Sequence, residues 1–94
     1  LQEAGVFAIV VEKVPATLAK ELSERLDVPI IGIGAGPDCD GQILVTHDML
    51  GLYTRFKPRF VRRYSELASA MLEAFEGYSN DVRSSDFPRE DESY

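Results

Sequence analysis

The chain is poor in cysteine and in positive charge. Its 94 residues include one cysteine, Cys39, and only 10 lysines and arginines against 16 aspartates and glutamates. A single cysteine excludes an intrachain disulfide and fits a reducing compartment. The net charge of -6 argues against nucleic acid or an anionic membrane surface as a partner, because both would repel the chain.

Long apolar runs are also missing. No stretch approaches the roughly 18 apolar residues of a membrane span, and no signal-peptide pattern is present. We therefore expect a cytoplasmic protein. With 45% hydrophobic and 28% charged residues, the composition is that of one small globular domain at most. The chain starts at Leu1 and not at Met, and we expect it to be part of something longer.

The apolar stretch FAIVVEKVP, residues 7–15, reads as a buried strand that ends in one carboxylate, Glu12. Strands buried on both faces belong mainly to parallel sheets covered by helices. Side chains alternate along a strand, so Phe7, Ile9 and Val11 are expected to face helices. Glu12 would then face the inside of a closed sheet.

The next two elements are predicted from spacing. From Pro15 to Leu26 the apolar residues recur at helical intervals, and Glu21 and Arg25 are separated by a favourable four residues. The helix is expected to stop at Asp27 to Pro29, because the residue before a proline is usually extended. A second strand is then expected at 30–33.

Three glycines, Gly32, Gly34 and Gly36, follow closely on this second strand. Strand parity predicts that Ile31 and Ile33 face the helices and that the glycines face inward. Inward glycines would leave room for a ligand to approach the backbone. The alternative is that they only shape a turn.

The segment after the glycines is ambiguous. Residues 43–46 have strand composition, whereas Asp40 is a good helix N-cap and Gly51 fits just past a helix end. Since parallel neighbours need a crossover of about a dozen residues, we favour a helix over 41–50. The third strand is then expected at 59–63.

A helical stripe runs from Tyr64 to Val82, with Ser65 as a plausible cap and Gly77 as a weak point. The resulting order of strand, helix, strand, helix, strand, helix is typical of an α/β protein. Since a complete (β/α)8 barrel needs about 250 residues, we expect residues 1–84 to be three β/α units of such a TIM barrel. Residues 85–94 would be an acidic C-terminal tail.

Three segments, VVEKVPATLAKEL, VPIIGIGAGPDCDGQILVTHDMLGL and PRFVRRYSEL, resemble the C-terminal part of the ketopantoate hydroxymethyltransferase family. The string GIGAG-P-x-x-DGQ-x-L-V-x-HD-x-x-G is long and specific. The ending FPREDESY resembles the family's FPG-x-EHSF tail, with Glu92 where a histidine is usual.

The resemblance implies the last three units of a (β/α)8 barrel that assembles into a homo-oligomer, typically a decamer. It further implies Mg²⁺ and the transfer of a hydroxymethyl group from 5,10-methylenetetrahydrofolate to the keto acid 3-methyl-2-oxobutanoate. The family's catalytic glutamate in V/L-E-x-V-P corresponds to Glu12, which would be the proton acceptor. The metal ligands of the family lie on earlier strands, so these 94 residues alone are expected to be inactive.

Other residues have competing interpretations. Without the resemblance, Glu12 would more simply be a strand-end ion-pair partner. Gly34, Ala35 and Gly36 are expected to line the pocket mouth and contact substrate through their backbone.

The remaining candidates rank lower as functional groups. His47 is expected to be a hydrogen-bonded core residue, and neither it nor its neighbour Asp48 has a partner at metal-ligand spacing. Cys39 is not expected to be a nucleophile. The cluster of Arg59, Arg62 and Arg63 would either attract the acidic end of a folate or form a solvated or subunit-facing surface.

Two rival functions remain open from the sequence. One is a metal-dependent carbon-carbon lyase or mutase of the phosphoenolpyruvate/pyruvate barrel superfamily, and folate dependence would separate it from a hydroxymethyltransferase. The other is a non-catalytic fragment or assembly module.

Overall fold

The N-terminal part of the chain is a strand–helix–strand unit, as the sequence predicts. The computed structural model describes residues 1–94 and contains β1 (Ile9–Glu12), α1 (Ala16–Arg25) and β2 (Ile30–Ile33). β1 and β2 are parallel, and their register pairs Ile9 with Ile30 and Glu12 with Ile33. A short 3-10 turn, η1 (Gln2–Ala4), precedes them. The expected α/β class with a parallel sheet is confirmed.

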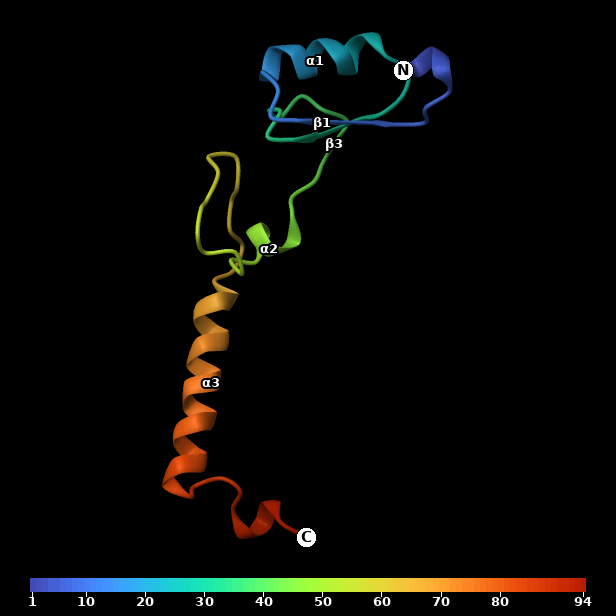
Figure 1. Ribbon diagram of the computed structural model, residues 1–94. Coiled ribbons are helices and arrows are strands. Elements are labelled where there is room, and N and C mark those ends of the chain that lie inside the picture. The colour runs from blue at the N-terminus through green and yellow to red at the C-terminus, as the bar shows by residue number, and fades with distance from the viewer.

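Helix α1 covers one face of this sheet (Figure 1). Leu22 of this helix and Leu26, just past its end, line an apolar groove together with Ile9, Val11 and Ile30 of the strands. Within the helix, Arg25 and Glu21 form the expected ion pair at 2.7 Å. The helix thus packs through its leucine face and exposes its charged face.

The register corrects one expectation about β2. Because paired residues of parallel strands share a face, Gly32 lies on the α1 side with Ile30, and Ile31 and Ile33 lie on the opposite side with Glu12. The prediction that Ile31 and Ile33 face the helices was therefore wrong. Ile30 is completely buried, and α1 packs on β2. The side chain of Ile30 therefore faces α1.

A third strand, β3 (Gly41–Gln42), is parallel to β2, with Gly41 opposite Ile31. The sequence argument for a helix over 41–50 was wrong at its start, because residues 34–40 alone make the return between parallel strands. Asp40 makes this possible. Its backbone N–H donates to the Ile30 carbonyl at 2.9 Å, and its Oδ2 accepts from the Ile30 N–H at 2.8 Å. Asp40 therefore joins the end of this return to β2 and is not a helix N-cap.

Only the end of the predicted helix forms, as α2 (Thr46–Met49). Gly51 follows it with a left-handed φ of 69°, as expected for a residue just past a helix end. The strand expected at 59–63 is absent. The Val61 N–H donates to the Pro58 carbonyl and the Tyr64 N–H to the Met49 carbonyl, so the segment bonds to a turn and to α2 and not to a neighbouring strand.

The last long element is α3 (Leu67–Ser84), which continues through Gly77 and contains no buried residue. It begins after Glu66, so Ser65 is not its cap. In the tail, η2 (Glu90–Glu92) is stabilised locally: Glu92 accepts a hydrogen bond from the Arg89 N–H at 2.8 Å. None of these helices combines the length and apolarity that crossing a membrane requires.

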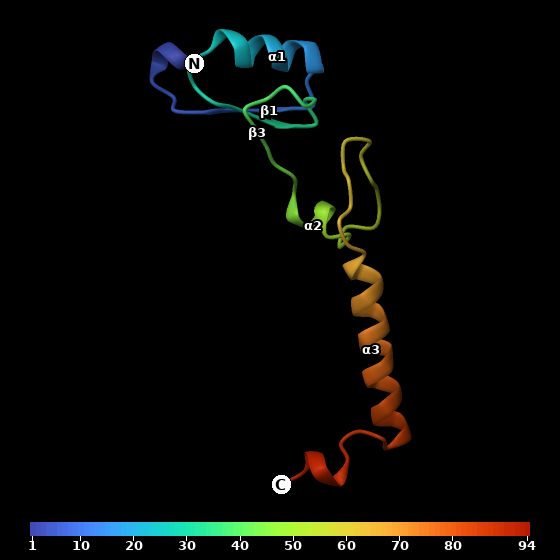
Figure 2. The same ribbon diagram turned by 180° about the vertical axis from the view of Figure 1, so that it is seen from behind.

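The sheet with α1, the segment around α2, and α3 lie one after another in an elongated arrangement (Figures 1 and 2). The molecule measures 67 × 29 × 16 Å, with a radius of gyration of 22.0 Å, whereas a compact domain of this length would have about 12 Å. Seven residues are buried, and the apolar ones are Ala19, Ile30, Ile33, Ala35 and Val61. The core therefore lies around β2 and the loop after it.

Candidate active site

The candidate site lies at the carboxyl ends of β1 and β2. Glu12 is the last residue of β1 and Ile33 the last of β2, and the two are paired across the sheet. The Lys13 N–H donates to the Ile33 carbonyl at 2.9 Å, which extends the pairing one residue past β1. In parallel sheets this edge is where ligands bind. The side chain of Glu12 is exposed here, on the sheet face away from α1.

Lys13 has an unusual backbone. Its φ of 52° lies in the left-handed region, which costs a residue with a side chain about 1–2 kcal/mol. This conformation turns the chain out of the strand directly after Glu12. The carboxylate is thereby kept at the very end of β1. It lies beside the start of the loop after β2, residues 34–40, which we call the glycine loop.

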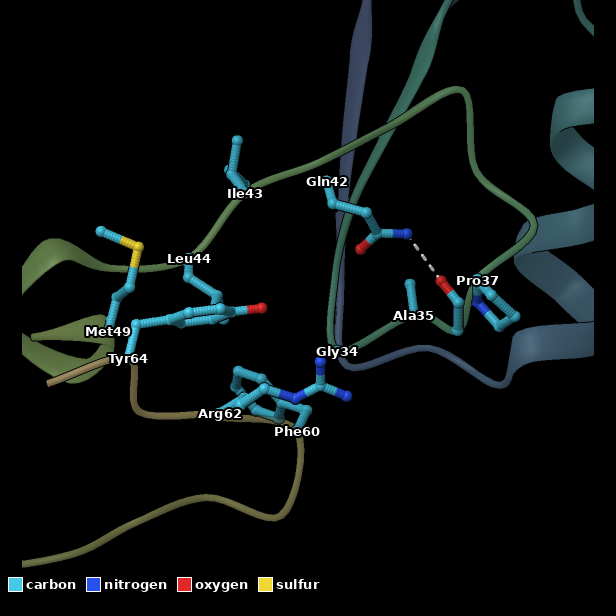
Figure 3. A pocket seen from close by; sticks show the side chains of 11 residues that line it. Gly34, Ala35, Pro37, Gln42, Ile43, Leu44, Met49, Phe60, Arg62 and Tyr64 are labelled. Carbon is cyan, nitrogen blue, oxygen red and sulfur yellow. Dashed lines mark hydrogen bonds between the residues drawn. The ribbon is translucent and has the colours of Figure 1, made fainter.

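A cleft of about 680 Å³ opens next to this edge (Figure 3). Three stretches of chain supply its walls: the loop after β2, the stretch from β3 into α2, and the irregular segment before α3. The lining residues are Gly34, Ala35, Gly36, Pro37, Gln42, Ile43, Leu44, Met49, Phe60, Arg62 and Tyr64.

The loop wall of the cleft is fixed by hydrogen bonds from the DGQ sequence. Gln42 donates from Nε2 to the Gly36 carbonyl at 2.8 Å, while Asp40 binds Ile30 as described above. The Ile30 N–H, and then the Ser23 hydroxyl, stabilise the charged carboxylate and lower the pKa of Asp40 from its ordinary value of 3.8. Asp40 therefore fixes the end of the glycine loop to β2, and Gln42 fixes its middle at Gly36.

The glycines are required by close approach of other groups. A Cβ on Gly34 would lie 2.8 Å from the Phe60 ring, and one on Gly36 would collide with Ala16 at the start of α1. A Cβ on Gly32 would lie 2.7 Å from the Cys39 Sγ. The turn-shaping interpretation applies to Gly34 and Gly36, whose φ values of 63° and 82° are left-handed, and Gly34 also lets an aromatic ring form part of the cleft. Gly32 lies inside β2 and leaves room for Cys39.

The structure separates the predicted site residues into two groups. Gly34, Ala35 and Gly36 line the cleft. Glu12 does not line it, although its pairing with Ile33 puts it one residue before the cleft begins. The carboxylate and the cleft therefore share an edge and form adjacent parts of one region.

His47 is exposed on α2, so the expectation of a core histidine was wrong. Cys39 is half-buried against Gly32. No group of three or more histidine, cysteine, aspartate or glutamate side chains converges anywhere in the chain. The residues present therefore do not form a Mg²⁺ site by themselves.

Two arginines of the cluster have different surroundings. Arg63 donates to the Tyr53 carbonyl at 3.0 Å and lies 3.7 Å from Glu66, so its role is structural. Arg62 lines the cleft together with Phe60 and Tyr64. Sequence reasoning did not single out these two aromatic residues. Alternation at 60, 62 and 64 would put these side chains on one side of a strand, but the segment forms no strand, and only the folded chain brings them to the cleft.

The chain is similar in sequence to proteins of one known family. The model of the family described as ketopantoate hydroxymethyltransferase matches residues 1–90. The chain is 62% identical over all 94 residues to the 3-methyl-2-oxobutanoate hydroxymethyltransferase of Chlorobaculum tepidum, covering 34% of that protein. Identities are 56% to the enzymes of the same name from Caldicellulosiruptor saccharolyticus, with 36% of that protein covered, and Moorella thermoacetica, with 35% covered.

The chain spans about a third of the length of these curated relatives. The match includes all of the elements that carry the carboxylate and the cleft. The chain therefore belongs to the ketopantoate hydroxymethyltransferase family.

Proposed function

We propose that the protein containing this chain transfers a hydroxymethyl group from 5,10-methylenetetrahydrofolate to 3-methyl-2-oxobutanoate and gives 2-dehydropantoate. The observation that carries the proposal is the identity of 62% over the whole chain to a relative named for this hydroxymethyl transfer. The family match extends across Glu12 and the residues that line the cleft.

Glu12 is the proposed proton acceptor. The reaction requires removal of a proton from the keto acid carbon next to the ketone, so that this carbon can form the new carbon–carbon bond. A base must lie within hydrogen-bond reach of that carbon's proton. Glu12 fits this role because its carboxylate ends β1 at the edge where parallel sheets bind ligands, and no residue of the chain forms an ion pair with it. Gly34, Ala35 and Gly36 would contact substrate through their backbone at the neighbouring cleft.

The magnesium ion that the resemblance implies would stabilise the negative charge that develops on the keto oxygen. Its ligands would have to come from parts of the protein outside these residues, since no ligand cluster converges here.

The surrounding architecture is proposed as a (β/α)8 barrel that forms a homo-oligomer. Two features support consecutive β/α units: β1 and β2 are parallel and joined by α1 on one face, and the opposite face carries Glu12 and Ile33. That this part is the C-terminal third of the barrel stays a prediction.

The test uses a chimera in which this chain replaces the matching third of the Chlorobaculum tepidum relative. Supplied with Mg²⁺, keto acid and 5,10-methylenetetrahydrofolate, the chimera should form 2-dehydropantoate. Glu12→Gln should lower kcat by about 10²–10⁴-fold, the usual contribution of a general base. Glu73→Gln, which removes a carboxylate on exposed α3, is the matched control. A kcat for Glu12→Gln equal to that of the parent would remove Glu12 from the mechanism.

A further inference from the structure

The cleft contains one charged residue. Of its lining side chains only Arg62 is ionised at neutral pH, although the chain as a whole carries a net charge of -6. A cleft that concentrates positive charge in an acidic protein favours an anionic ligand. The ligand class is therefore set by Arg62.

Arg62 has no partner within the chain. Its neighbour Arg63 is bound to the Tyr53 carbonyl and lies beside Glu66, with 21% of its side chain exposed. No hydrogen bond or ion pair of this kind involves Arg62, whose guanidinium points into the cleft toward Gly34 (Figure 3). A guanidinium presents a planar set of donors that matches a carboxylate.

Other groups around Arg62 further restrict the kind of ligand that the cleft can bind. The Tyr64 hydroxyl points into the same space, and Gln42 keeps its amide oxygen free because its Nε2 is bound to the Gly36 carbonyl. The remaining walls are mainly apolar, from Leu44, Met49 and Phe60. Such a cleft suits a long, partly apolar ligand with a carboxylate at one end.

We propose that Arg62 binds a carboxylate of the glutamate end of the folate co-substrate. This inference rests on the proposed function, in which both substrates are carboxylates. The keto acid is the less suitable of the two, because so short a molecule, with its carboxylate separated from the reacting carbon only by the keto carbon, would leave the apolar wall of Leu44, Met49 and Phe60 without contacts. The folate is long enough to react near Glu12 and extend into the cleft.

The experiment compares the parent chimera with Arg62→Gln. The measured quantities are KM for 5,10-methylenetetrahydrofolate, KM for the keto acid, and kcat. We expect the folate KM to rise about ten-fold or more, as for loss of a charged hydrogen bond, with the other two constants unchanged. With the amide of 5,10-methylenetetrahydropteroate, which has neither glutamate nor a free carboxylate, parent and variant should have the same KM.

Arg59→Gln is the control, because Arg59 lies in the same segment but does not line the cleft. Calorimetric binding of tetrahydrofolate gives a second readout that does not depend on turnover. The inference is overturned by an unchanged folate KM, by an equal effect on the pteroate analogue, or by a rise in the keto acid KM. Failure of the proposed function looks different, since the parent chimera would then form no product.

Discussion

Asp40 fixes the position of the glycine loop relative to β2. Its backbone N–H and its carboxylate bind the carbonyl and the N–H of the same residue, Ile30. The N–H of Ile30 stabilises the charged form of the carboxylate, and this lowers the pKa of Asp40. A group with a lowered folded-state pKa stabilises the fold above its unfolded pKa and loses that contribution as pH falls through the folded value.

Asp40→Asn should therefore destabilise the chimera most near neutral pH. Melting temperatures of parent and variant, measured from pH 7 to pH 3, should converge as pH falls below 3.8, the ordinary pKa of this group. The difference between the two proteins is the quantity to follow, because other carboxylates titrate in both. A difference that stays constant over this range would show that the charge of Asp40 is not involved.

Single residues of the site were predictable to different degrees. Strand parity and the resemblance predict Glu12 at the end of β1, on the sheet face away from α1, where the structure has it, whereas parity put Gly32 on the wrong face. The role of Arg62 could not be separated from that of Arg63 in the same way. The difference between them depends on contacts with Tyr53 and Glu66, and only the folded chain brings these residues together.

At the scale of elements, the glycine loop packs directly on α1. Gly36 has a φ of 82°, and a Cβ at this position would collide with Ala16. Gly36→Ala should destabilise the chimera by about 1–3 kcal/mol, the range for overpacking a tight contact, and should disturb the cleft wall. The free energy of unfolding in urea measures this effect.

Gly77→Ala is the matched control for that substitution. Gly77 lies inside α3, and a Cβ there would meet nothing within 4 Å. Alanine should stabilise the helix by about 1 kcal/mol. If both substitutions destabilised the chimera equally, the contact between Gly36 and Ala16 would not be the cause.

The elements with their own local signal were predicted correctly. β1 and β2 are short apolar runs closed by turn residues, and α1 and most of α3 have helical periodicity. β3 was missed because two residues carry no periodic pattern and because Asp40 allows an unusually short return. The strand expected at 59–63 was wrong because strand formation requires a neighbouring strand, and this segment bonds to Pro58 and Met49 instead.

At the scale of the whole molecule, the isolated chain should be inactive. Its elongated form buries only seven residues, and no metal-ligand cluster is present. We expect the 94-residue chain to show no hydroxymethyl transfer and no tight Mg²⁺ binding, measured by product formation and calorimetry. Turnover by the isolated chain under conditions in which the chimera is active would contradict this expectation.

The hydrogen bonds between Asp40 and Ile30 also have a consequence for the order in which the chain folds. They close β1, α1, β2 and β3 into one contiguous unit between residues 9 and 42. Bringing together residues that are close in the chain costs little loop-closure entropy. The edge that carries Glu12 can therefore form from this unit, whereas the cleft beside it is complete only when residues 60, 62 and 64 have also been placed.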